Sequence, residues 1–331
     1  MRITNLAIIF VLIAVPFVMI SNLKLWDMKA VSIKTLEINR LLDSASEDAA
    51  SALTEVGEDG RVTINKENAV EGFFNSLYIN FDVLSNSTLQ KKIQGYVPVV
   101  AVVDYDGYYI FSQETYEGAS GYSETKHVWK PKKMFSYSDG RYVYAFTLDD
   151  YVTVYDTMDA ANKVFYEGYY EDIKSFVSGS IMDSREIFDQ TRRNVIVDSI
   201  KADINYFINR HNKVASKYGI TYNFAPPSIP DEDWYRTISD VGVIAFFQGI
   251  PIGTGGEVFN SFAIGGGRLV KQQKYYVVHT GDSASINYYH RQDCEQLPRR
   301  GGQIDWEATD VYSSRKECAG KGYYPCPECQ P

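Results

Sequence analysis

The sequence predicts an α+β protein in four segments. A transmembrane helix continues into a long amphipathic helix, a mixed body of antiparallel sheet and helices follows, and a small α+β module ends the chain. Three observations predict this: an uncharged N-terminal run, alternating hydrophobic stretches and turn residues in the middle, and cysteines found only from Cys294 onward. We place the segments at residues 1–24, 25–56, 57–270 and 271–331.

The N-terminal run of residues 3–23 has no charged side chain, and residues 6–20 are nearly all aliphatic or phenylalanine. As a helix at about 1.5 Å per residue this run measures about 31 Å, enough to cross a bilayer core. Pro16 is compatible with a spanning helix. We interpret the run as a membrane anchor. A cleaved secretory signal, a buried core helix and pilin-like processing are the alternatives.

Residues 24–56 keep a helical pattern, with apolar or small residues spaced four and three apart toward its end. They are Val31, Ile38, Leu42, Ala45, Ala49, Ala52 and Val56. This spacing predicts a stalk that packs along another helix. Residues 1–56 resemble the N-terminal helix of type IV pilins and of pilin-like proteins from tight-adherence secretion loci, which implies a surface assembly. The apolar run lacks the glutamate usual in pilins, and a stalk packed on its own domain is the alternative.

The middle of the chain predicts a mostly antiparallel sheet with helices beside it. Strands are expected at residues 61–65, 96–103, 108–112, 133–137, 142–147, 151–155 and 241–247. Helices are expected at residues 66–80, 159–177, 185–218 and 231–239. His211 continues an apolar helix face and is expected to be packed. The glycine-rich residues 253–256 and 265–268 fit no phosphate-binding motif and indicate turns.

Composition narrows the function. The chain has 331 residues, 26 tyrosines and a formal net charge of -9. An acidic chain without a basic stripe is not typical of a nucleic-acid-binding protein. No serine or cysteine nucleophile can be combined with the four histidines into a catalytic arrangement. We therefore expect a non-enzymatic protein, with no small-molecule substrate identified.

The most specific chemical signal is a pair of short-spaced ligand motifs near the C-terminus. His290 and Cys294 are separated by three residues, and Cys326 and Cys329 by two. Two such pairs on separate turns are what a tetrahedral Zn²⁺ site requires, and metal binding would supply folding energy to a small module. Two alternatives stay open: Cys318 replaces His290 as a ligand, or the four cysteines form two disulfides.

Residues 275–331 also resemble the Ada-type metal-binding domain of bacterial methyl-phosphotriester repair proteins. The resemblance rests on Tyr289-His290, Cys294 and an ending of Gly322-Tyr323, Pro325-Cys326 and Cys329. In that family the first of four cysteine ligands accepts the methyl group, and His290 stands at this position. The resemblance thus implies a structural zinc site without repair activity. It also places Cys318 in a buried position of the preceding helix.

The membrane orientation and the function can be predicted only from charge distribution and composition. Lys24, Lys29, Lys34 and Arg40 follow the apolar run, which favours an inward body. The acidic, tyrosine-rich and largely cysteine-free body favours the outside. We expect a single-pass protein of a bacterial cell membrane with an extracellular body, contacting lipid and, through its stalk, protein partners. It would be a component of a surface secretion or pilus-like assembly. The alternatives are a DNA-associated module of a transfer or repair system and a sensor-type ectodomain.

Overall fold

The computed structural model describes most of the chain. The described residues are 3–56, 62–117, 123–158, 165–215, 224, 240–252, 258–266, 275–278, 286–291, 294–300, 303–304, 308–312 and 315–331. The mixed helix-and-sheet class predicted from the sequence is confirmed within them. The predicted helix at residues 231–239 and the glycine-rich residues 253–256 lie outside them.

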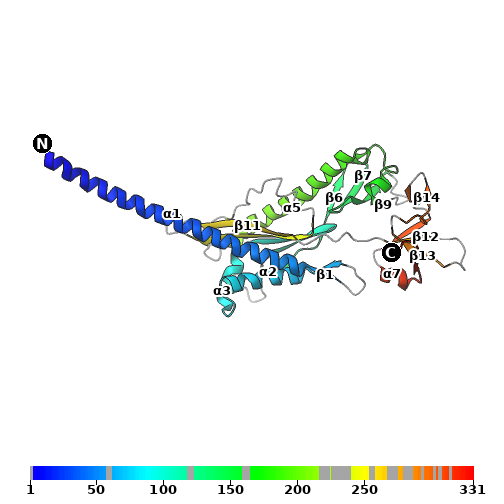
Figure 1. Cartoon of the computed structure of the whole chain (residues 1–331), viewed down its shortest axis with the longest axis horizontal. Helices are drawn as coiled ribbons and strands as arrows, with labels where there is room; N and C mark the ends of the chain where they lie inside the picture. Colours follow the sequence, from blue (N-terminus) through cyan, green and yellow to red (C-terminus); the bar gives the residue numbers. More distant parts are fainter. Residues whose placement is uncertain are drawn as a thin grey trace.

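The first helix, α1 (Ile3–Leu53), is continuous through Pro16 and joins the predicted anchor and stalk in one element of 51 residues. Its N-terminal half projects away from the rest of the molecule (Figure 1). In the described part of the chain this is the one helix long and apolar enough to cross a membrane, and none of its apolar window is buried. The alternative of a buried core helix is therefore wrong. The helix ends where β1 (Thr54–Val56) pairs with β2 (Val62–Ile64).

The C-terminal half of α1 packs on the body of the same chain. The buried side of the helix carries Ile38, Leu42, Ala45, Ala49 and Leu53. This side contacts α2 (Lys66–Asn80) and the strands β10 (Gly242–Pro251) and β11 (Val258–Gly266). The approach is close: a Cβ atom at Gly265 would lie 1.9 Å from the Ser46 carbonyl oxygen. From Ile38 onward, the predicted stalk therefore packs against the protein's own sheet and helix.

The body is built on one antiparallel sheet of nine strands. Besides β10 and β11 it contains β3 (Val99–Asp104), β4 (Gly107–Glu117), β5 (Ser123–Trp129), β6 (Lys133–Ser138), β7 (Tyr142–Phe146), β8 (Tyr151–Asp156) and β9 (Phe165–Tyr169). The order is β11-β10-β3-β4-β6-β7-β8-β9, and β5 pairs with β4. Tight turns connect β3 to β4 and β6 to β7, each between two strands that the sequence predicts, and Gly140 in the second turn has a φ of 102°.

Helices cover both faces of this sheet. Helices α1 and α2 lie on one face and α5 (Arg185–Ala215) on the other (Figure 1). Strand β4 shows the division: the Tyr108 hydroxyl donates a hydrogen bond of 2.7 Å to Asp203 of α5, and the Phe111 ring contacts Phe74 of α2. Because both faces are covered, the apolar residues 99–103 of β3 are completely buried.

Three smaller helical elements complete the body: α3 (Ser87–Gly95), α4 (Tyr170–Ile173) and the 3₁₀ turn η1 (Ile181–Asp183). The helix predicted at residues 159–177 is wrong. Strand β9 and the single turn α4 occupy its described part, because β9 pairs with β8 and Tyr169 packs edge-on against Tyr151. His211 is packed as predicted, with its Nε2 atom 3.1 Å from the Gly95 carbonyl oxygen.

The C-terminal region forms a separate four-stranded sheet. Its order is β16 (Thr309–Tyr312), β12 (Tyr275–Val278), β13 (Tyr288–His290) and β17 (Tyr324–Pro325). The pairing of β13 with β17 is parallel and the other two pairings are antiparallel. A short ribbon of β14 (Arg299–Arg300) and β15 (Gln303–Ile304) and the helix α7 (Arg315–Gly320) accompany it.

Candidate metal centre

The parallel pairing of β13 with β17 brings the two predicted ligand pairs together. His290 ends β13, and Cys294 stands in the turn that follows. Cys326 directly follows β17, and its backbone N–H donates to the Tyr289 carbonyl oxygen at 3.0 Å. A second turn, closed by the Gln330 N–H on the Cys326 carbonyl, places Cys329 on the same side. Backbone hydrogen bonds thus hold both turns in place.

The four side chains converge on one point. The candidate ligand atoms of His290, Cys294, Cys326 and Cys329 all lie within 4.8 Å of one another. The His290 Nδ1 atom is 3.2 Å from the Cys294 sulfur, which is 4.0 Å from the Cys326 sulfur. Tetrahedral coordination with bonds of about 2.0–2.3 Å separates ligand atoms by about 3.5–3.8 Å. The cluster can therefore hold a metal ion with small adjustments.

The surroundings favour the protonation states that a metal ligand needs. Burial lowers the pKa of His290, so its imidazole is neutral near pH 7. Although burial favours the thiol at Cys326, backbone N–H groups of Cys329 and Glu328 hold the pKa of Cys326 below its usual value. Burial raises the pKa of Cys294 to about 12, so a metal ion must displace that proton. The Arg291 N–H donates to the Cys329 sulfur at 3.4 Å.

Cys318 lies away from this cluster. It is completely buried in α7 and packs with Tyr275, Val277, Tyr289 and Tyr312. Tyr276, the next residue of β12, packs instead with Cys294 and Cys326. Since neighbouring strand residues point to opposite faces, Cys318 and the cluster are on opposite sides of the small sheet.

The four cysteines are free thiols in the structure. The 4.0 Å between the Cys294 and Cys326 sulfurs is about twice the length of a disulfide bond. This geometry disfavours both alternatives to the predicted ligand set, namely Cys318 as a ligand and a disulfide framework.

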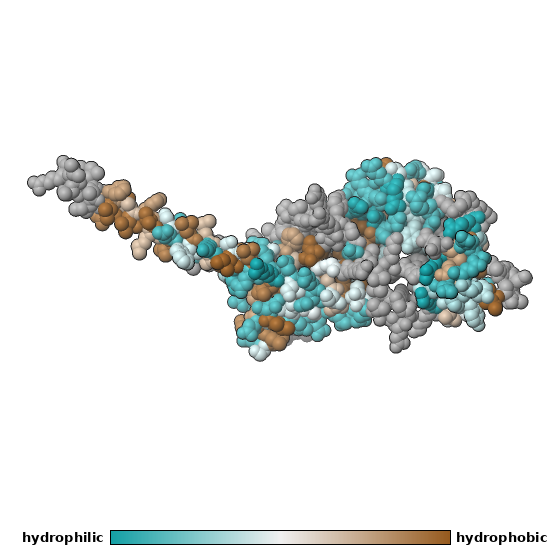
Figure 2. All heavy atoms as spheres, in the orientation of Figure 1, coloured by the Kyte–Doolittle hydropathy of each residue, from teal (hydrophilic) through white to brown (hydrophobic). Residues whose placement is uncertain are grey.

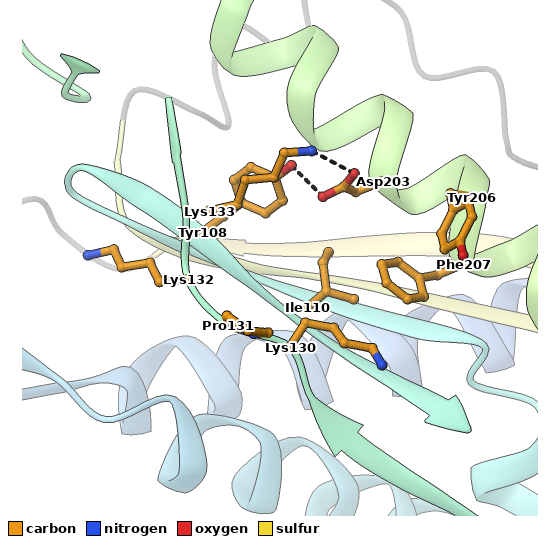
Figure 3. A pocket seen from close by; sticks show the side chains of 9 residues that line it. All are labelled: Tyr108, Ile110, Lys130, Pro131, Lys132, Lys133, Asp203, Tyr206 and Phe207. Carbon is orange, nitrogen blue, oxygen red and sulfur yellow. Dashed lines mark hydrogen bonds and ion pairs between the residues drawn. The ribbon is translucent and has the colours of Figure 1, made fainter. Parts of the chain in front are cut away.

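A second candidate site is a groove of about 500 Å³ in the body, between β4, residues 130–133 and α5. Figure 3 shows Tyr108, Lys133 and Asp203 at one end, and Phe207 at the other. The Lys133 Nζ and Tyr108 hydroxyl both donate to the Asp203 carboxylate, at 2.8 and 2.7 Å. The groove therefore joins a polar end to an apolar floor.

The other two lysines of the groove are also paired. Lys130 forms an ion pair with Glu114, and Lys132 with Asp104 and Asp106. Sequence reasoning missed this groove, because its lining comes from three segments that only the folded sheet and α5 bring together. Neither charge runs nor local spacing could have indicated it.

Comparison with known proteins identifies no relative. No family model, no curated protein and no solved structure matches the chain. The class of the protein is therefore defined by its own features: a mixed helix-and-sheet fold, a long apolar N-terminal helix and a histidine–cysteine cluster that can hold a metal ion. The resemblances to pilin-like and Ada-type proteins stay predictions.

Proposed function

We propose that the protein is a single-pass protein of a bacterial cell membrane whose body and zinc-stabilised C-terminal region act as a non-enzymatic structural or interaction component. The projecting half of α1 carries this proposal. Its large side chains from Phe10 to Leu25 are exposed, and Figure 2 shows hydrophobic residues along its length. Water does not tolerate an apolar surface of this extent, whereas lipid does.

Membrane attachment is tested with the full-length chain in bacterial membranes. A sodium carbonate wash releases peripheral proteins and leaves a spanning helix in the pellet. We expect the full chain in the pellet with its N-terminal segment intact by mass spectrometry. Release into the supernatant contradicts the anchor, and a mature chain that begins after residue 23 identifies the run as a cleaved signal instead.

Orientation is tested separately with a membrane-impermeant protease. We propose an extracellular body. The protease should therefore digest the body when the outer envelope of the cells is permeabilised and the inner membrane is still intact. Protection of the body until the inner membrane is broken would place it inside. This result would also remove the support for a surface secretion or pilus-like assembly.

We propose Zn²⁺ as the ion at the cluster of His290, Cys294, Cys326 and Cys329. Three thiolates and one imidazole form a ligand set that zinc favours over hard cations such as Mg²⁺ or Ca²⁺. The role is structural, because four protein ligands leave no open position for water or substrate.

The ligand set is tested by metal analysis of purified full-length protein in detergent. We expect about one zinc per chain in the wild type. The His290→Ala variant should lose most of it, and Cys318→Ala, the matched control on the opposite face of the sheet, should keep it. The reverse pattern would transfer the ligand role to Cys318. A wild type without bound metal after zinc supplementation would contradict the site.

The groove of the body favours a second candidate function, a sensor-type ectodomain. A cavity of about 500 Å³ with a polar end and an apolar floor has the size of small-molecule sites. A thermal-shift screen of small organic acids and amines tests it, with Phe207→Ala as the comparison. A compound that stabilises the wild type and not the variant supports sensing. A screen without such a compound contradicts it.

A further inference from the structure

Between the proposed anchor and the body, one segment of α1 is largely exposed. From residue 24 to residue 37 no side chain is buried, although five large apolar residues lie here. Trp26 is 74% exposed, Ile33 59% and Leu36 57%, and Leu25 and Met28 are similarly open. A lone helix of this length is marginal in water, and such side chains add an apolar surface to it. A surface of this kind favours a partner that covers it.

Three of these five exposed residues share one side of the helix. At about 100° per residue, Trp26, Ile33 and Leu36 fall within one arc of about 80°. Ile38 and Leu42, which pack on the body, fall on the roughly opposite side of the helix. The body therefore does not cover the stripe, and it leaves that side of α1 accessible along the whole segment.

The stripe continues toward the N-terminus in one register. Alternating steps of three and four residues connect eight positions that share this face: Leu12, Val15, Met19, Asn22, Trp26, Lys29, Ile33 and Leu36. We call these eight residues the α1 stripe. All eight are exposed in the single chain. Seven-residue periodicity of this kind is the pattern by which two helices pack as a left-handed coiled coil.

We propose that the α1 stripe binds the same stripe of a second copy of this chain, in parallel and in register. This inference rests on the proposed membrane anchor. A bilayer holds two anchored copies in the same orientation and at the same height, so identical residues meet and their effective concentration is high.

The two polar positions of the α1 stripe fit this pairing. Asn22 lies at the end of the uncharged run, where two side-chain amides hydrogen-bond across parallel helices and specify their register. Lys29 can extend its long stem out of the contact and keep its charge in water. Beyond Leu36 the same side carries Arg40 and Asp43. The predicted contact therefore ends at Leu36, just before the helix reaches the body.

The test counts copies of the full-length protein in sparse proteoliposomes by single-molecule photobleaching. The disruptive variant is Ile33→Glu with Leu36→Glu. The matched control is Lys34→Glu with Asp27→Lys, which exchanges two charges that lie about 100–120° around the helix from Ile33. We expect two copies for the wild type and the control. The double glutamate variant should weaken pairing at least about tenfold, since two buried apolar contacts are lost.

Cross-linking in membranes gives the register. A cysteine introduced by Ile33→Cys should form a disulfide-linked dimer on mild oxidation, whereas Lys34→Cys and the chain without an added cysteine should not. Single copies of the wild type, or equal cross-linking at positions 33 and 34, would overturn the pairing. A carbonate wash of the same liposomes separates the two proposals. Retained single copies refute the pairing alone, and release of the chain refutes the anchor and the pairing with it.

Discussion

The body and the C-terminal region are both sheets with helices beside them, yet they differ greatly in the size of their buried cores. The body has one continuous core with large completely buried rings, among them Phe73, Tyr108, Phe135 and Phe246. The C-terminal region has strands of two to four residues and two small clusters of buried side chains, one on each face of its sheet. A region with so little buried surface needs another source of stability, and the histidine–cysteine cluster supplies a place for it.

Removal of the metal should affect the C-terminal region far more than the body. We expect chelation, or the Cys326→Ser variant, to abolish the fold of the C-terminal region, because structural zinc contributes on the order of 10 kcal/mol to such folds. Hydrogen exchange provides the measurement. Amides of β12 and β13 should lose protection, while those of β3 and β10 stay protected. Unchanged protection of β12 after complete chelation would show that the region folds without the ion.

The converse experiment perturbs the body alone. Phe73 is completely buried and packs edge-on against Phe74. The Phe73→Ala variant should lower the free energy of unfolding of the body by about 3–5 kcal/mol, through lost burial and a cavity. Chemical denaturation measures this change. Metal content per chain serves as the control and should equal that of the wild type. A parallel loss of metal would mean that the two regions fold as one unit.

Acid should weaken the body through two buried histidines. His127 contacts the Phe74 and Phe111 rings, and His211 packs against Phe224. Burial lowers the pKa of each to about 4, and for His211 the proximity of His127 adds to this effect. The Nδ1 atom of His211 has no hydrogen-bond partner among the described residues, so a proton there would be unsatisfied.

The sign of the pH dependence follows from proton binding. Between pH 6.5 and about 4 the unfolded chain binds more protons than the native one, so stability falls as the pH falls through this window. The loss is up to about 3 kcal/mol for each histidine. Denaturation at several pH values measures it, and the His211→Gln variant should show a shallower slope. An identical slope in wild type and variant would contradict this origin.

The smallest expected effect on stability is that of a substitution at Cys318. Its size distinguishes a cysteine that only packs from one that binds the metal. Its thiol is buried among the tyrosines on the face away from the metal cluster, and burial raises its pKa to about 11. The Cys318→Ala variant should lower the stability of the C-terminal region by about 1 kcal/mol through lost contacts. Thermal unfolding at saturating zinc measures the change. A loss comparable to that of Cys326→Ser would assign Cys318 a role at the metal.

Local patterns were sufficient for some parts of this structure. Hairpin turns such as the one at Gly140 are specified by a few adjacent residues, and they occur where the sequence predicts them. The strand β9 was not predictable in the same way. Its aromatic residues also match a helical stripe, and pairing with β8 decided between the two.

The sequence by itself determined the features that depend on neighbouring residues. The uncharged run of residues 3–23 and the two short-spaced ligand pairs are of this kind. Only the tertiary structure decided which side of α1 packs on the body, that Cys318 faces away from the cluster, and that a groove forms between β4 and α5. The physical reason is that these three outcomes depend on contacts between segments far apart in the chain. Local propensity and spacing carry no information about which distant surface a side chain will meet.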